Sequence, residues 1–174
     1  TAAIISAILV GAKITKIKKS LLNFKGVKRR FTFLGKIKKS SIYDDYAHHP
    51  TEIKASYEIA KYLSKKRIIV IFQPHRYSRT KSLYKDFLKV LKKIDILYIY
   101  DIYTAGEKPI KNINSLNLVK DLQKDKSNVY HLSKKHNLQK ILLPYFNDEN
   151  LIIFMGAGSI TYFANNLVKD YNAQ

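Results

Sequence analysis

The sequence of 174 residues predicts an α/β protein in which a mostly parallel sheet carries helices on both faces. The first reason is a regular alternation of short apolar runs with stretches of helical periodicity after residue 40. The second is that unusual polar residues follow several of these apolar runs, which is typical of ligand sites at the carboxyl ends of parallel strands. A chain of this length can bury a substantial core.

The elements are expected in the following order. Two helices come first, at 1–11 and 15–24, separated by Gly11, and a strand lies near Phe31 to Lys38. Further strands are expected at 41–44, 67–72, 94–100, 128–131 and 151–155. Helices are expected at 51–64, 80–92, 116–124, 138–145 and 160–168. A domain boundary is expected between Phe33 and Ser41.

The composition narrows the class of protein. With no cysteine, the chain has no disulfide framework and no zinc site built on thiolates, which is compatible with the cytoplasm. Its longest apolar stretch, 2–12, is too short to span a membrane. The net charge of +19 raises the alternative of a basic nucleic-acid-binding module. The lysines are scattered, however, so no specific nucleic-acid partner is expected.

Polar residues follow four of the predicted strands. They lie in Asp44–Pro50, Gln73–Arg79, Tyr103–Pro109 and the Gly156-Ala-Gly158 turn. The carboxyl ends of parallel strands meet at one edge of a sheet, so these segments are expected to lie together. Lysine-rich turns occupy the opposite edge.

Two arginines stand out in the segment FQPHRYSRT, residues 72–80. Only five of the 32 basic residues are arginine, and Arg76 and Arg79 lie three apart where a helix is expected to begin near Thr80. A guanidinium group presents a planar fork that matches a carboxylate or phosphate, and a helix amino end adds positive potential. This loop therefore predicts an anion site; surface arginines held in salt bridges are the alternative.

Two other segments leave alternatives open. The aspartates and histidines of DDYAHHP, residues 44–50, could hold a divalent metal, as in a metal-dependent phosphoesterase, or the histidines could be packing residues. Gly156-Ala-Gly158 could cradle a phosphate or could be only a tight turn between a strand and a helix.

Five ordered motifs together resemble the Mur ligases of peptidoglycan synthesis. They are GVKRRF at 26–31, DDYAHHPTEIKA at 44–55, FQPHRYSRT at 72–80, DIYTAGEKPI at 101–110 and GAGSI at 156–160. The resemblance implies that residues 1–37 end a central ATPase domain and that residues 38–174 form a Rossmann-like C-terminal domain. The sequence contains no G-x-x-x-x-G-K-[ST] phosphate loop. The amino-terminal and central domains are therefore expected to be missing, and this chain is not expected to catalyse a reaction alone.

The resemblance also implies a reaction. It is the ATP-dependent joining of L-alanine to UDP-N-acetylmuramate through an acyl phosphate, in the cell-wall pathway. ATP and magnesium are the implied cofactors, and the metal ligands are expected in the missing central domain. No metal site is expected in this chain.

The same resemblance implies roles for individual residues. Arg30 is expected to reach an ATP phosphate and Asp45 the ATP ribose. The residues implied for the amino-acid side are Tyr46, His48, Arg76 and Arg79. Of these positions, Arg30, His48 and Arg76 are the ones expected to take part in catalysis, and His75 is expected to support the two arginines.

One position departs from the pattern implied by this resemblance. Residue 47 is alanine where the alanine-adding Mur ligases usually have glycine. The murein-tripeptide recycling ligases, a sister group, resemble DDYAHHP here but do not resemble FQPHRYSRT, so they remain the alternative within the family. The alanine is a small change unless the backbone needs a positive φ.

Overall fold

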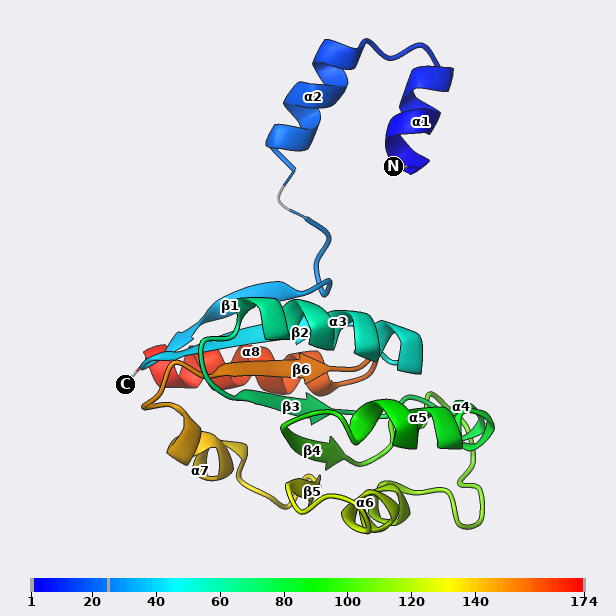
Figure 1. The fold of residues 1–174 in the computed structure, drawn as a ribbon, viewed down its shortest axis with the longest axis vertical. Helices are drawn as coiled ribbons and strands as arrows, with labels where there is room; N and C mark the ends of the chain where they lie inside the picture. The colour runs from blue at the N-terminus through cyan, green and yellow to red at the C-terminus, as the bar shows by residue number, and fades with distance from the viewer. Residues whose placement is uncertain (1, 25, 174) are drawn as a thin grey trace.

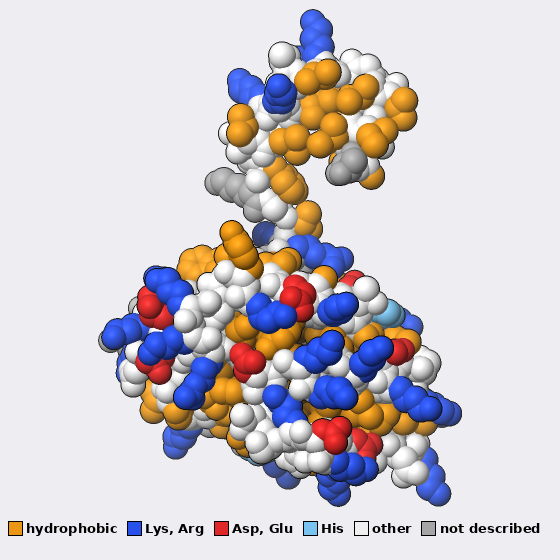
Figure 2. All heavy atoms as spheres, in the orientation of Figure 1, with side chains coloured by type: hydrophobic (Ala, Val, Ile, Leu, Met, Phe, Trp, Pro, Cys, Tyr) orange, Lys and Arg blue, Asp and Glu red, His pale blue; other side chains and the backbone are white. Residues whose placement is uncertain are grey.

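A computed structural model describes residues 2–24 and 26–173. The chain begins with two helices, α1 (Ala2–Leu9) and α2 (Ile14–Leu22), which form a hairpin apart from the sheet (Figure 1). None of their residues is buried, and apolar side chains are visible on the hairpin surface (Figure 2). Both helices agree with the sequence prediction, except that Thr1 lies outside the described residues.

The strands form one six-stranded sheet in the order β1-β2-β6-β3-β4-β5. Their bounds are β1 (Thr32–Ile37), β2 (Ser40–Asp45), β3 (Ile68–Phe72), β4 (Ile96–Tyr100), β5 (Val129–Leu132) and β6 (Leu151–Met155). β1 is antiparallel to β2, and all the other pairs are parallel. The predicted mostly parallel sheet is therefore confirmed.

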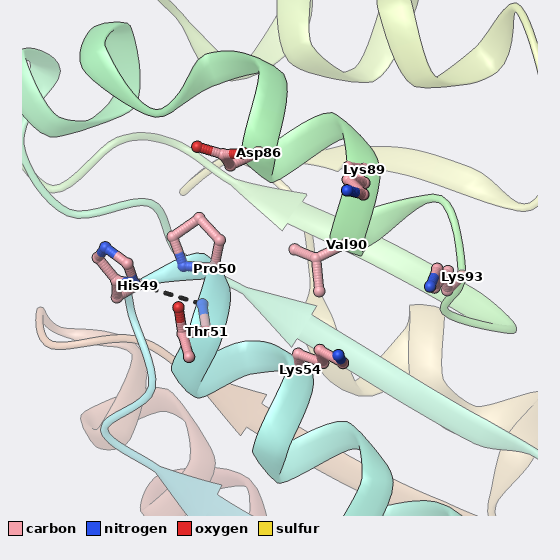
Figure 3. Close-up of a pocket in the computed structure, with 8 residues that line it drawn as sticks. All are labelled: His49, Pro50, Thr51, Lys54, Asp86, Lys89, Val90 and Lys93. Atoms are coloured by element: carbon pink, nitrogen blue, oxygen red, sulfur yellow. Dashed lines mark hydrogen bonds between the residues drawn. The ribbon is translucent and has the colours of Figure 1, made fainter.

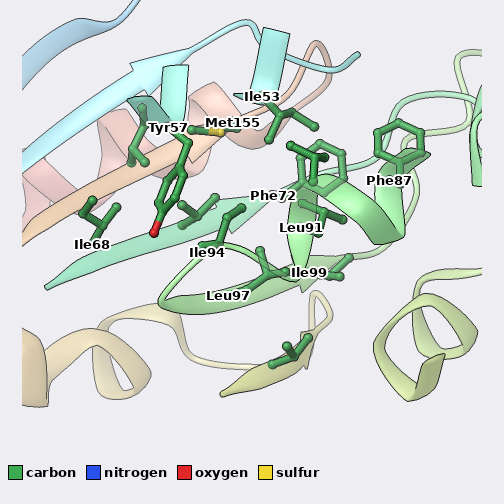
Figure 4. Close-up of a cluster of buried hydrophobic side chains, with 14 of the residues drawn as sticks. Ile53, Tyr57, Ile68, Phe72, Phe87, Leu91, Ile94, Leu97, Ile99 and Met155 are labelled. Carbon is green, nitrogen blue, oxygen red and sulfur yellow. The ribbon is translucent and has the colours of Figure 1, made fainter. Parts of the chain in front are cut away.

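Helices cover both faces of the sheet (Figure 1). One face carries α3 (Pro50–Leu63), α5 (Tyr84–Leu91) and α6 (Ser115–Gln123), and the other carries α7 (Leu138–Leu142) and α8 (Ile160–Asn172). On the first face, Ile53, Phe87 and Leu97 are fully buried in one cluster (Figure 4). On the second face, Phe154 and Ile160 are fully buried in another. Two apolar layers thus hold the sheet rigid, which fixes the ends of its strands in space.

Two predicted helices differ from those observed. The stretch 80–92 is divided into α4 (Tyr77–Ser82) and α5, which meet at Leu83. α4 begins three residues earlier than predicted, because Thr80 donates from both its N–H and its hydroxyl to the carbonyl of Arg76. The stretch 138–145 ends in a short 3₁₀ turn at Leu143–Tyr145, where Pro144 has no N–H to continue the α-helix.

β1 bears on the domain boundary. A boundary between residues 37 and 38 would separate β1 from β2, although the two strands are hydrogen-bonded to each other. Their pairing runs from Thr32 opposite Asp44 to Ile37 opposite Ser40. β1 also packs its buried Ile37 into the second core cluster. We therefore propose that the sheet domain begins ahead of Arg29 rather than after residue 37.

No helix within residues 2–24 and 26–173 combines the length and the apolar character needed to cross a membrane.

Candidate active site at the carboxyl edge of the sheet

Three central strands end side by side. Asp45 of β2 and Phe72 of β3 are both paired with Met155 of β6, so the loops that follow these strands leave from one edge. The backbone of His75 forms a further parallel bridge with Tyr103, which brings in the loop after β4. The predicted gathering of polar loops at one edge is present.

Asp45 organises three of these segments. Its carboxylate is buried; one oxygen accepts the N–H of Ala47 at 2.7 Å and the other accepts the N–H of Phe31 at 2.8 Å. Its carbonyl accepts the N–H of Gly156 at 3.0 Å. Each carboxylate oxygen thus already accepts a backbone N–H. Through these two bonds, Asp45 connects the segment before β1 to the loop after β2. The predicted contact with an ATP ribose stays a prediction.

His48 is held in a defined orientation. Its Nδ1 lies 2.9 Å from the carbonyl oxygen of Tyr46 and 3.4 Å from the Glu52 carboxylate. Both neighbours are acceptors, so we assign the ring proton to Nδ1, which leaves Nε2 as an acceptor in the neutral ring. The rings of Tyr46 and His48 meet edge-on, with centroids 5.1 Å apart.

Glu52 fixes the start of α3 beneath this loop. Its carboxylate accepts the N–H of His48 at 3.0 Å and that of His49 at 3.2 Å, and His49 in turn caps the N–H of Thr51. Partial burial acts to raise the pKa of Glu52, but the two backbone hydrogen bonds and the nearby His48 and Arg30 lower it overall. This carboxylate therefore stays ionised and keeps the histidine loop in place.

His75 lies between His48 and Tyr103. Its ring is 5.6 Å from that of His48 and stacks on that of Tyr103 at 5.4 Å, with an interplanar angle of 13°. A guanidinium nitrogen of Arg79 donates to His75 Nδ1 at 3.2 Å. Burial lowers the pKa of His75, and its electrostatic interactions with His48, Arg79 and Arg76 lower it further. A neutral His75 can thus accept the bond that orients Arg79.

Arg76 and Arg79 present guanidinium groups without a carboxylate partner among the described residues. Arg76 is exposed and precedes α4 with a left-handed backbone, φ 73°, and its N–H donates to the carbonyl of Tyr103 at 2.8 Å. Arg79 lies in the first turn of α4 and is partly buried. In the described part of the chain neither arginine has a carboxylate within 4.0 Å, so the alternative of arginines held in surface salt bridges is not what the structure contains.

Arg30 reaches the same edge from the segment before β1. Its side chain is 56% exposed, lies 3.8 Å from Glu52 and has its guanidinium carbon 5.5 Å from the centre of the Tyr46 ring. Its neighbour Arg29, which the sequence analysis did not single out, points inward to the turn after β6. The doubled arginine in GVKRRF was the available signal for it.

The glycine-rich turn is explained by close packing. A Cβ at Gly158 would lie 2.5 Å from the ring of Tyr103 and 2.6 Å from Oε1 of Gln73. That same oxygen accepts the N–H of Ile160 at 3.0 Å, so the first turn of α8 is already bonded by the protein. Gln73, missed by the sequence analysis, is therefore the residue that fixes this turn. The geometry favours a tight turn over a phosphate cradle.

The described residues at this edge are not arranged to bind a metal ion. Within residues 2–24 and 26–173, no three histidine, aspartate or glutamate side chains are placed to hold a metal ion. The two aspartates of DDYAHHP instead accept bonds from protein groups, Asp45 from the backbone and Asp44 from the Thr161 hydroxyl at 3.0 Å. The metal-dependent phosphoesterase therefore has no ligand set in the described residues.

A groove of about 400 Å³ lies beside this edge, between α3 and α5 (Figure 3). Its lining includes His49 and Thr51 at the start of α3 and the lysines Lys54, Lys89 and Lys93. It opens on the helical face, and neither Arg76 nor Arg79 lines it. Other lysines are spread over the same face (Figure 2), so its charge is not distinctive.

Comparisons with known proteins agree with this architecture. Residues 29–158 match the family model described as Mur ligase, glutamate ligase domain. The chain belongs to the Mur ligase family. The match begins at Arg29, ahead of β1, and ends in the glycine-rich turn.

Individual relatives are also similar to this Mur ligase chain. The UDP-N-acetylmuramate–L-alanine ligase of Rickettsia felis is 44% identical over 172 residues, which is 94% of this chain and 36% of that protein. The enzyme of the same name from Rickettsia massiliae is 46% identical, with the same coverage. The crystal structure of UDP-N-acetylmuramate–alanine ligase from Thermotoga maritima matches with a TM-score of 0.77 and 27% identity, over 99% of this chain and 36% of that one. The chain thus spans about a third of the length of these relatives.

Proposed function

We propose that this chain is the carboxy-terminal part of an ATP-dependent ligase that joins L-alanine to UDP-N-acetylmuramate in peptidoglycan synthesis. The observation that carries the proposal is the pair of arginines without a carboxylate partner in the described chain, Arg76 and Arg79, at the edge of the sheet that also carries His48 and His75. Relatives that cover nearly the whole chain bear the name of this activity, which supports the same assignment.

The amino-acid side of the site suits L-alanine in its zwitterionic form. Arg76 and Arg79 supply planar, charged donors for the carboxylate. His48 Nε2 is an acceptor, which can take a proton from the alanine ammonium group and so free its lone pair. The amine then attacks the carbonyl carbon of the acyl phosphate, and phosphate leaves as the C–N bond forms. Tyr46 and His75 limit the movement of the His48 ring, since their rings lie 5.1 and 5.6 Å from it. Together the side chains would hold the amine oriented for attack.

The nucleotide side fits ATP in part. The exposed guanidinium group of Arg30 is suited to a phosphate, where it would offset charge during phosphoryl transfer. Asp45 would meet the ribose only by accepting bonds beyond the two backbone bonds it already accepts. The described residues offer no ligand set for magnesium, so we assign its ligands, the phosphate loop and the UDP-N-acetylmuramate site to the remainder of the enzyme.

The recycling ligase is the weaker proposal within the family. A murein peptide ligase from Psychrobacter arcticus matches with a TM-score of 0.65 but 18% identity, which shows a shared fold only. Ala47, the residue that raised this alternative, is fully buried and is not among the described residues with a positive φ. Alanine is therefore compatible with this loop whatever the substrate.

The first prediction tests the proposal in the complete enzyme with Arg76→Lys. Lysine keeps the charge but loses the planar fork, so the alanine carboxylate should be held less well. Loss of a charge-assisted pair costs on the order of 1.5–3 kcal/mol, which corresponds to a decrease of roughly ten- to a hundredfold in kcat/KM for L-alanine. The Michaelis constant for ATP should change much less, because Arg30 is retained.

Steady-state kinetics with each substrate varied in turn would measure this effect. Arg67→Lys is the matched control, since Arg67 is exposed at the start of β3, at the opposite edge of the sheet. It should leave both constants near their wild-type values. If Arg76→Lys raised the Michaelis constant for ATP and left kcat/KM for L-alanine unchanged, the loop would have been assigned to the wrong ligand.

A further inference from the structure

The guanidinium group of Arg29 joins two loops that are far apart in the sequence. One nitrogen, Nη2, donates to the carbonyl of Gly156 at 2.7 Å and to that of Gly158 at 3.4 Å. The guanidinium carbon lies 4.6 Å from the centre of the Tyr46 ring, and Nε lies 3.9 Å from an oxygen of the buried Asp44. Charge-assisted bonds and a cation–π contact are stronger than their neutral counterparts. Arg29 thus ties the segment before β1 to the loops that end β2 and β6.

The backbone around Arg29 is held as firmly as its side chain. Its carbonyl accepts the N–H of Tyr46 at 2.7 Å, and the N–H of Phe31 donates to Asp45 at 2.8 Å. Arg29 and Phe31 have positive φ values of 59° and 46°. Such a left-handed backbone is unfavourable for a non-glycine residue, because its Cβ approaches the following carbonyl oxygen. The surrounding contacts therefore stabilise a turn that the chain would otherwise avoid.

Arg29 is also where the incoming chain first meets the sheet. Residues 26–28 are exposed, and none of the described residues before them is buried. No hydrogen bond joins residues 2–24 or 26–28 to the residues after Arg29. Among the described residues, Arg29 is therefore the first that is bonded to the sheet domain.

We propose that Arg29 is a positioning residue for the ligase reaction. It bonds the segment before β1 to the loops that follow β2 and β6. This bonding sets the position of Arg30 relative to the loop of Tyr46 and His48. The proposal rests on the proposed function, in which Arg30 serves the phosphate and His48 the attacking amine. These groups act on one acyl phosphate, so a displacement between them slows the reaction without removing any group that binds substrate.

Hydrogen exchange of the 174-residue chain tests the fastening without any turnover. In Arg29→Ala, the amide protons of Phe31 and Tyr46 should exchange at least about tenfold faster, the effect of losing roughly 1.4 kcal/mol of local protection. Amides of β3 and β6 should keep their rates. Arg67→Ala, the same change at an exposed arginine, is the control and should leave all of these rates unchanged. Unchanged exchange at Phe31 and Tyr46 in Arg29→Ala would overturn the proposal.

Two further variants separate the side chain from the backbone. Arg29→Gly relieves the left-handed strain but removes the guanidinium group, so it should still show fast exchange. Arg29→Lys keeps the charge and one donor, so it should restore part of the protection, and it remains informative if Arg29→Ala does not fold. Protection restored fully by glycine would assign the effect to backbone strain and overturn the role of the side chain.

Kinetics of the complete enzyme test the functional consequence. Arg29→Lys should lower kcat by about tenfold or more, while the Michaelis constants for ATP and L-alanine stay within about threefold. A wild-type kcat in Arg29→Lys would overturn the positioning role. If the wild-type enzyme did not use L-alanine at all, the proposed function would fail, whereas the exchange result would still decide whether Arg29 fastens the segment.

Discussion

His75 shows how one residue links the geometry of the site to the pH dependence of stability. Its ring is packed between His48 and Tyr103 and accepts a bond from Arg79. Burial and the neighbouring positive charges lower its pKa below the usual value of 6.5. The unfolded chain therefore binds a proton at a pH where the folded chain does not. Stability from this residue is complete above pH 6.5 and is lost as the pH falls below it.

The second prediction follows from that sign. Between about pH 7.5 and 5, wild-type protein should lose stability more steeply than His75→Gln, because the variant has no proton to take up on unfolding at this position. Urea unfolding at a series of pH values would measure the slope. A His75→Gln slope as steep as that of the wild type would show that His75 is not the group responsible.

Ala47 shows what sequence alone could not decide about a single residue. The alanine raised doubt only if the backbone required a positive φ, and no local pattern reveals that angle. In the structure Ala47 has no positive φ, is fully buried and donates its N–H to Asp45. Its methyl group packs in the core cluster beneath α3. The question turned on tertiary placement, which the residue type does not encode.

At the scale of elements, the turn between β6 and α8 is fitted to its neighbours. Gly156 has φ 155°, and a Cβ there would lie 2.9 Å from the carbonyl of Gln73. Gly158 has no unusual φ but faces the ring of Tyr103, so its requirement is purely one of space. The Gln73 side chain then holds the start of α8. The turn thus packs the loop after β4 closely against the end of β6.

The third prediction is that Gly158→Ala destabilises the protein by roughly 1–3 kcal/mol, the usual effect of overpacking a filled site. The added methyl group would displace Tyr103, and with it the stacked ring of His75. Chemical denaturation would measure the loss, and near-ultraviolet circular dichroism would report the tyrosine. Lys108→Ala changes an exposed residue in the loop of Tyr103, and it should leave the free energy of unfolding nearly unchanged. A Gly158→Ala protein as stable as the wild type would mean that the turn is looser than its contacts indicate.

Elements with strong periodicity could be predicted from the sequence, and those shaped by side-chain bonds could not. The buried strands β3 and β6 are short apolar runs and were placed correctly to within a residue. The early start of α4 follows Arg76 in a left-handed backbone, and the division of α4 from α5 lies at Leu83, whose ψ is 19°; neither arginine nor leucine gives a local signal for such an angle. The loops after β2 and β3 were singled out because they follow strands, whereas the roles of their residues, and Arg30 ahead of β1, came from the resemblance to the Mur ligases. Gln73 and Arg29 were missed because their roles depend on contacts with residues 85 or more positions away.

At the scale of the whole molecule, the sheet domain and the amino-terminal hairpin differ in how they are stabilised. The sheet has two buried apolar clusters of its own, while the hairpin has no buried residue and exposes Leu9, Leu22 and Phe24. The sheet domain therefore has the core of an independently folding unit. It carries the candidate amino-acid side of the site, but the sequence has no phosphate loop and the described residues have no ligand set for magnesium.

The fourth prediction concerns that separation of folding from catalysis. The isolated 174-residue chain should unfold cooperatively in urea, yet release no phosphate from ATP with magnesium and L-alanine present. The reason is physical: under the proposed function, Arg30 alone would offset too little charge on the transferring phosphoryl group, which would need a metal ion and a backbone cradle as well. The unfolding curve is the internal control, since it shows that inactivity does not come from a disordered chain. Phosphate release that exceeded the buffer rate and disappeared in Arg30→Ala would show that this chain holds a complete phosphoryl-transfer site.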